Sequence, residues 1–193
     1  HYVFQVSEDF RGTIWITVNS RDVKSSRGLN WGHSWSETWA EQTFEYTFDG
    51  DTLIMHYAYG GEDPEHSDEY TTGSIKCEHI TRVTITDTTK GNVTGVDFGF
   101  SFELIVNTRD GDDAPGEDRY IQGSLRQFLA NANAIAGGQH SRFVMMVRPN
   151  SRDSNGAWWT ITLDRSLGHL EILWEGADTI LNGTVYYEDG TVR

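Results

Sequence analysis

Short runs of alternating hydrophobic and polar residues dominate the first half of the chain. In GTIWITVN, Ile14, Ile16 and Val18 share one side of an extended chain, and Thr13, Trp15 and Thr17 share the other. The longest such run is VTGVDFGFSFELIVNT, residues 93–108, in which Val96, Phe98, Phe100, Phe102, Leu104 and Val106 are in phase. This period of two predicts β-strands with one face turned towards a core.

A β-hairpin is predicted between residues 44 and 59, where two alternating runs flank the turn pair Asp49-Gly50. A further strand is predicted in SIKCEHITRVTITD, whose in-phase residues are Cys77, His79, Val83 and Ile85. Several short strands separated by turn residues favour a mostly β fold, with layered sheets of the β-sandwich or jelly-roll kind.

The pattern changes at GSLRQFLANANAIAGG, residues 123–138. Ser124 is a suitable N-cap, and Gln127 lies three residues later, where a capping box needs it. The apolar positions follow the helical period of 3.6 residues: Leu125, Phe128, Leu129, Ala132, Ile135 and Ala136. Because Gly137 and Gly138 suit a helix end, we expect one amphipathic helix over about residues 124–136 that covers an apolar edge or face. Short strands are expected after it.

The net charge narrows the choice of partners. The chain has 193 residues, with 29 acidic and 15 basic side chains and a formal charge of −14. Such a surface repels phosphates and anionic lipids, which argues against nucleic acid as a partner. No apolar run approaches the ~18 residues of a membrane span, so membrane insertion is not expected.

Five motifs in residues 93–186 occur in a characteristic order: VNT (106–108), GSLRQ (123–127), ANANA (130–134), TITL (160–163) and DTILNGT (178–184). In this series the chain resembles the N-terminal cap segment of secreted bacterial surface proteins built on a right-handed parallel β-helix. The resemblance implies that the helix caps the open end of the β-helix and that the strands after it form the first rungs. It also implies a β-sandwich module over 1–106, followed by the capping helix and short strands over 107–193, or one continuous domain.

The chain after Gly138 is long enough for about two rungs of ~20 residues, whereas a continuous β-helix core needs at least three. The remaining pairing would come from a larger protein, from closure into a compact sandwich, or from another copy. HYVFQV offers a segment for the last route, because Tyr2, Phe4 and Val6 alternate and could form a donor strand in a neighbour's sheet. The other interpretation is that it is the first strand of its own sandwich.

Two metal sites are candidates. His1 could bind copper through its amine and ring, as in lytic polysaccharide monooxygenases, with one of six other histidines: His33, His56, His66, His79, His140 or His169. Calcium could bind to a carboxylate-rich loop formed by Asp110, Asp112, Asp113, Glu117 and Asp118. A second acidic cluster lies at residues 61–69. Charge runs of this kind are also common in solvated loops.

WSETWAEQTFEY places Trp35 and Trp39 on one face of a predicted strand with Glu37 and Glu41. Such a face could stack on a sugar, and paired carboxylates are what glycoside hydrolysis requires. Two sequons, at Asn92 and Asn182, would accept N-linked glycans in a compartment that supplies them. Cys77 is the only cysteine, so no intrachain disulfide forms, and a small buried core residue is the favoured interpretation over a reactive thiol.

The sequence therefore favours a secreted, acidic protein of the cell surface that is non-catalytic and serves a structural or adhesive role. We expect it to join copies of itself into a filament, or to contact other surface proteins or glycans. The alternative is a carbohydrate-active protein, either copper-dependent at His1 or a glycan binder or hydrolase near Trp35–Glu45.

Overall fold

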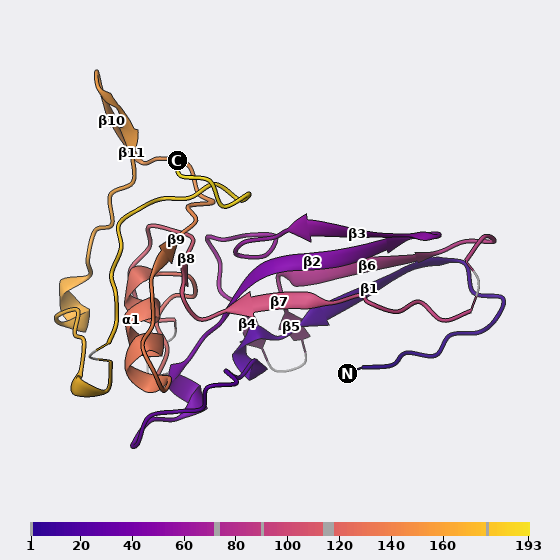
Figure 1. Ribbon diagram of the computed structural model, residues 1–193, viewed down its shortest axis with the longest axis horizontal. Helices are drawn as coiled ribbons and strands as arrows, with labels where there is room; N and C mark the ends of the chain where they lie inside the picture. Colours follow the sequence, from indigo (N-terminus) through magenta and orange to yellow (C-terminus); the bar gives the residue numbers. More distant parts are fainter. Residues whose placement is uncertain (1, 72–73, 90, 114–117, 177) are drawn as a thin grey trace.

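The computed structural model describes residues 2–71, 74–89, 91–113, 118–176 and 178–193 (Figure 1). In chain order its strands are β1 (Gly12–Val18), β2 (Glu41–Asp49), β3 (Thr52–Tyr57), β4 (Glu69–Thr71), β5 (Ser74–Lys76), β6 (His79–Ile85), β7 (Phe98–Ser101), β8 (Leu104–Ile105), β9 (Arg142–Phe143), β10 (Ser151–Asp153) and β11 (Gly156–Trp158). The described residues hold one α-helix, α1 (Leu125–Ala134), and short 3₁₀ turns at Ser20–Asp22, Trp35–Glu37, Arg165–Leu167 and Trp174–Gly176. This confirms the predicted mostly β fold with several sheets and a single helix.

The main sheet has the strand order β1-β6-β2-β3, and β7 pairs with β2 as a fifth strand. The predicted hairpin is β2–β3, but its turn lies one residue later than expected. Asp49 faces Thr52 in the register, which leaves Gly50 and Asp51 as the two loop residues. Gly50 has a φ of 68°, and a glycine with positive φ at the first loop position is what a two-residue hairpin turn favours.

The predicted strand 93–108 is divided in two. β7 belongs to the main sheet, and after a bend at residues 102–103 β8 pairs in parallel with β9. Three consecutive residues beyond the bend, Leu104, Ile105 and Val106, are all buried. The chain there is covered on both sides, since Ile105 packs with the helix and its two neighbours pack around Tyr59 and Val144.

Three separate chain segments stack in parallel beside the helix. Ile105 pairs with Phe143, which in turn pairs with Val185. The backbone N–H of Val144 donates to Ile105 O at 3.0 Å, and that of Tyr186 donates to Phe143 O at 2.8 Å. The C-terminal part is therefore a short parallel stack. The expected LEILW segment, residues 170–174, forms no regular strand and leads into the 3₁₀ turn at Trp174–Gly176.

The helix begins as predicted, because Ser124 Oγ accepts a hydrogen bond from Gln127 N at 3.0 Å. The expected capping box is not completed: the Gln127 side chain accepts from Tyr120 N and donates to Glu37 O instead. The apolar face of α1 packs on the parallel stack. Phe128, Leu129 and Ala132 of the helix form one cluster there with Ile105 and Met145.

The polar side of α1 is buried too, which corrects the expectation of a simple amphipathic lid. Asn131 accepts from Trp39 N and donates to Trp39 O, both at 2.8 Å, and also donates to Phe102 O. Arg126 forms an ion pair with Asp110 at 2.7 Å, and both side chains are almost fully buried. The polar side of α1 therefore forms hydrogen bonds to Trp39 and Phe102 and an ion pair with Asp110.

Candidate functional site

Strand β3 forms one edge of the main sheet, and among the described residues it pairs only with β2 (Figure 1). All six of its residues are exposed, including four large apolar ones: Leu53, Ile54, Met55 and Tyr57. An edge strand that is apolar, exposed on both faces and without proline or lysine is open to pairing with another strand.

The hairpin register decides which backbone groups of β3 are free. Asp49 and Thr52 close the two-residue loop and exchange hydrogen bonds, as does every second pair after them. The same phase continues to Ala58, whose N–H donates to Thr43 O at 3.1 Å. The residues whose backbone groups point towards the open edge are therefore Leu53, Met55 and Tyr57.

Residues 2–6 belong to no helix or strand. Their backbone makes no hydrogen bond to another backbone group within the described part of the chain. Phe4 is 62% exposed, and Tyr2 and Val6 are also exposed. The Tyr2 hydroxyl donates to Val96 O, and burial, assisted by the charge of Asp97, raises the pKa of Tyr2. The segment is thus an apolar stretch of chain outside the sheet, whereas the alternative prediction made it the first strand of its own sandwich.

The outer segment of the parallel stack is also apolar and accessible. Ile180, Leu181, Tyr187 and Val192 are all exposed, as are Ile172, Leu173 and Trp174 in the preceding segment. The C-terminal residues cover the outer side of this segment, since Tyr186 forms an antiparallel bridge with Val192 and the Arg193 N–H donates to Val185 O at 2.8 Å.

Among the described residues of the predicted calcium loop, no three carboxylates meet closely enough to hold an ion. Asp110 pairs with Arg126, Asp113 with Arg21, and Asp118 accepts from Ser36 Oγ. Asp112 forms a β-bridge with Tyr120, and Glu117 lies outside the described residues. Because two of these carboxylates are bound to arginines on different segments, the loop is held by protein cations, and the calcium assignment is not supported.

The predicted aromatic surface is also corrected. Trp35 and Glu37 belong to a 3₁₀ turn, not to a strand. Trp39 is 1% exposed, and the guanidinium groups of Arg21 and Arg119 lie over its ring. Trp39 therefore offers no face to a sugar. Trp35 is half-buried, and it does not share an exposed face with Trp39 as expected.

The remaining predicted residues are dispersed. His1 lies outside the described residues. Asn92 is exposed, whereas Asn182 is half-buried and accepts hydrogen bonds from both the N–H and the hydroxyl of Thr184. Burial raises the pKa of the Cys77 thiol to about 11, assisted by neighbouring carboxylates, so the thiol stays protonated at neutral pH.

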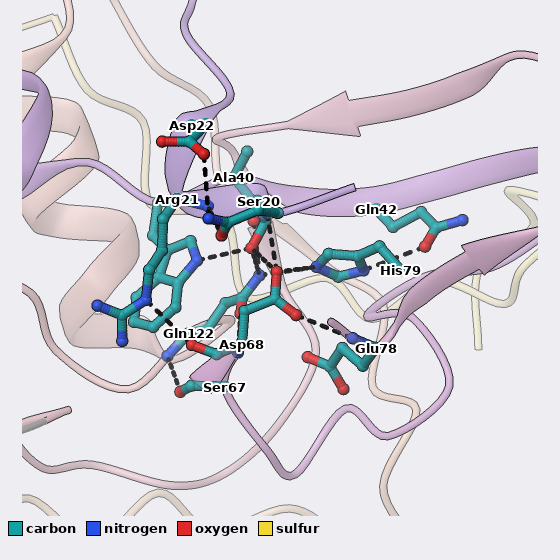
Figure 2. Close-up of polar contacts among 12 residues, drawn as sticks. Ser20, Arg21, Asp22, Ala40, Gln42, Ser67, Asp68, Glu78, His79 and Gln122 are labelled. Atoms are coloured by element: carbon teal, nitrogen blue, oxygen red, sulfur yellow. Dashed lines mark hydrogen bonds and ion pairs between the residues drawn. The ribbon is translucent and has the colours of Figure 1, made fainter. Parts of the chain in front are cut away.

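A site that was not predicted lies at the beginning of β6, where Asp68 connects several segments through its side chain (Figure 2). Asp68 Oδ2 accepts from Ser20 N at 2.8 Å and from Ser20 Oγ at 2.6 Å, and Oδ1 accepts from Glu78 N at 2.9 Å. His79 Nε2 lies 3.7 Å from Asp68 Oδ2. Asp68 and His79 are almost completely buried, and Glu78 is half-buried.

Two glutamine side chains hold the imidazole of His79. Nδ1 lies 3.1 Å from Gln42 Oε1, and Nε2 lies 3.0 Å from Gln122 Nε2. This assigns the Nδ1–H tautomer, since an amide oxygen only accepts and an amide nitrogen only donates. Burial lowers the pKa of His79, although the charge of Asp68 opposes this, and the ring is neutral at pH 7.

Two carboxylates of this cluster have an oxygen without a partner. Glu41 Oε2 and Glu78 Oε1 are buried and form no hydrogen bond to any described residue. Burial, then the charge of Asp68, raises the pKa of Glu41 well above its ordinary value. Burial, then the charges of Glu41 and Asp68, raises the pKa of Glu78 to about 10. The three carboxylates therefore lie close enough to repel one another in a poorly solvated region.

Two glycines leave room for this cluster. A Cβ on Gly61 would lie 2.7 Å from His79 Nδ1, and a Cβ on Gly123 would lie 2.5 Å from Glu41 Oε1. From the sequence, His79 was one of six histidines that could join His1 at a copper ion, Asp68 lay in the acidic cluster at residues 61–69, and Glu41 lay on the predicted sugar-stacking face. Asp68 and Glu41 come from distant segments, so their approach could be found only from the fold.

The chain matches no known protein-family model, and it has no significant match among solved structures.

Proposed function

We propose that this protein is a secreted, non-catalytic structural subunit of a cell surface that joins copies of itself by strand addition. Residues 2–6 of one copy would pair with the open edge of β3 in the next. The observation that carries the proposal is that one chain presents both an unpaired apolar segment and an unpaired apolar strand edge. Secretion and the cell surface rest on the resemblance of residues 93–186 to β-helix cap segments.

The two elements match in length and in chemistry. Residues 2–6 are five in number and β3 has six, and each alternates apolar side chains that are exposed in the monomer. Main-chain hydrogen bonds to Leu53, Met55 and Tyr57 would supply affinity. Burial of the apolar side chains on both elements would contribute roughly 25 cal/mol per Å² removed from water.

The topology favours pairing between copies that propagates. The segment leads into β1, which lies at the opposite end of the strand order from β3 (Figure 1). Donor and acceptor are therefore different surfaces of the subunit, which makes the contact head-to-tail. Such a contact extends into a filament unless its rotation closes a ring.

Negative-stain electron microscopy and sedimentation velocity of the full chain test this proposal. We expect filaments, and we expect Phe4→Asp or Met55→Pro to abolish them. Met55→Pro removes an outward N–H and leaves the β2–β3 bonds intact, because proline is tolerated on an edge strand whose N–H faces solvent. Trp31→Asp is the matched control, since it places the same charge at a side chain that is 95% exposed elsewhere.

Mixing the two variants gives a sharper result. Phe4→Asp retains an intact edge and Met55→Pro retains an intact donor, so an equimolar mixture can form one junction only. The expected product is a heterodimer that does not grow. A monomeric native chain, filaments that persist in both variants, or a mixture that stays monomeric would each overturn the assignment.

A further inference from the structure

We propose that Asp68, Glu78 and His79 bind a divalent transition-metal cation, with Glu41 as a neighbouring carboxylate. One oxygen of each acid and one ring nitrogen of the histidine lie within 4.8 Å of one another. Within the described part of the chain, these are the only three acidic, histidine or cysteine residues that meet in this way. In Figure 2 the carboxylate of Asp68 faces the imidazole of His79 and, through its other oxygen, the backbone N–H of Glu78.

The distances require only a small rearrangement. Ligand atoms at about 2.0–2.2 Å from a zinc ion lie roughly 3–3.5 Å from one another. A contraction of at most about 1.3–1.8 Å from the observed spacing would therefore bring the three atoms into the coordination sphere. Glu78 is the half-buried member, so its side chain can move and also offers a route from solvent.

The unpartnered oxygens are an independent reason to expect a cation. Glu41 is 3% exposed, and its Oε2 has no hydrogen-bond partner among the described residues. The Oε1 atom of Glu78 is also buried and also has no such partner. An unsatisfied buried acceptor costs about 1–3 kcal/mol, and more where the group is charged. A cation bound by Glu78 would satisfy the carboxylate of that residue, and its charge would also stabilise the neighbouring carboxylate of Glu41.

The charges point in the same direction. No arginine or lysine whose side chain is described forms an ion pair with Glu41, Asp68 or Glu78. A divalent ion would supply the positive charge that these neighbouring carboxylates lack among the described side chains. An imidazole beside carboxylates suits zinc or manganese better than calcium, which prefers oxygen ligands throughout.

His79 can give up a hydrogen bond at little cost. Gln122 Nε2 carries two hydrogens but lies within hydrogen-bond distance of three acceptors, namely Ser20 Oγ, Ala40 O and His79 Nε2. If Nε2 binds a metal, the amide still donates to the other two. Gln42 continues to accept from Nδ1–H and orients the ring, as outer-shell partners of metal-binding histidines commonly do.

The resulting site would be a structural staple. It would tie the segment before β4 to the start of β6, and Glu41 would bring β2 to its margin. Asp68, His79 and Glu41 are all buried, which suits a structural ion better than a substrate.

The test is metal binding by the full-length chain stripped with a chelator. We expect one Zn²⁺ per chain by calorimetry and elemental analysis after dialysis, and a visible absorption band when Co²⁺ is added instead. Glu78→Gln should raise the dissociation constant for Zn²⁺ by at least about tenfold and remove the cobalt band. Circular dichroism confirms that the variant is folded.

Glu65→Gln is the matched control, because Glu65 is an exposed acid in the loop that leads to Asp68. It should bind Zn²⁺ as the native chain does. A native chain that binds no Zn²⁺ would overturn the proposal. So would a Glu78→Gln variant with native affinity, because surface histidines such as His66 would then account for the binding.

Discussion

The main sheet and the region around α1 are stabilised in different ways. The apolar cluster of the sheet has only three buried members, Ile16, Val83 and Val96, and every residue of β3 is exposed. Around the helix, Phe128, Ala132 and Ile105 are at most 1% exposed. Polar side chains are buried there as well, and they make hydrogen bonds to backbone groups of distant segments.

This difference indicates where stability lies and where surface remains available. The helix region is closed, since both its apolar and its polar groups have partners within the chain. The sheet ends in the edge strand β3, whose outward backbone groups have no partner among the described residues and whose apolar side chains are exposed. A subunit that assembles by strand addition needs this combination, a rigid body with an open edge.

The largest expected effect is in the helix region. Phe128→Ala removes a ring that is 1% exposed and leaves a cavity beside Ile105, so we expect a loss of about 3–5 kcal/mol in the free energy of unfolding. Leu53→Ala in β3 should change it by no more than about 0.5 kcal/mol. Urea denaturation of both variants measures the contrast, and equal losses would show that the two regions contribute alike.

A smaller loss is expected for Asn131→Ala. Asn131 satisfies the N–H and the C=O of Trp39, and its removal leaves both groups buried without partners. We expect a loss of about 2–3 kcal/mol. Asn30, which donates to backbone carbonyls at the end of the helix, is a less buried amide for comparison. If Asn30→Ala costs as much as Asn131→Ala, burial is not what sets the value of these bonds.

The third prediction concerns how the free energy of unfolding of the metal-free protein depends on pH. The pKa of Glu78 rises from its ordinary value of 4.5 to about 10 in the folded chain. Between pH 4.5 and about 10 the unfolded chain has therefore released the Glu78 proton, whereas the folded chain still holds it. Because the folded state binds more protons over this range, its free energy of unfolding falls as the pH rises towards 10. Unfolding free energies measured over this range should fall less steeply for Glu78→Gln than for the native chain.

Part of that slope should remain in the variant, because the pKa of Glu41 is raised in the same direction. Glu65→Gln, which replaces an exposed acid outside this cluster, is the matched control. Equal slopes in the native chain and Glu78→Gln would mean that the glutamate is solvated in the folded state.

The elements that were predicted well depend on local patterns. The helix was expected over residues 124–136 and is found at Leu125–Ala134, because its N-cap and its apolar period are properties of adjacent residues. The strand 93–108 was predicted as continuous, but it divides at residues 102–103. Alternation shows that a chain is extended, and it does not show to which sheet each half belongs.

The functional residues show the same limit. Clustered acids at 110–118 suggested calcium, but arginines at positions 21 and 126, far away in the sequence, occupy two of those carboxylates. Glu41, Asp68 and Glu78 have no spacing that suggests a common site, because β2, the loop before β4 and the start of β6 bring them together. Whether an arginine or another acid lies close to a carboxylate depends on distance in space, and the spacing of residues in the sequence does not give that distance.

The sequence by itself determined that the chain is acidic, mostly β and interrupted by one capped helix, since charge, alternation and helix caps are local properties. Only the tertiary structure decided that the polar side of this helix is buried, that β3 is an open edge and that three carboxylates share a poorly solvated region with a histidine. The physical reason is that burial and pairing depend on which distant segments come into contact, and the free energy of those contacts belongs to the whole fold.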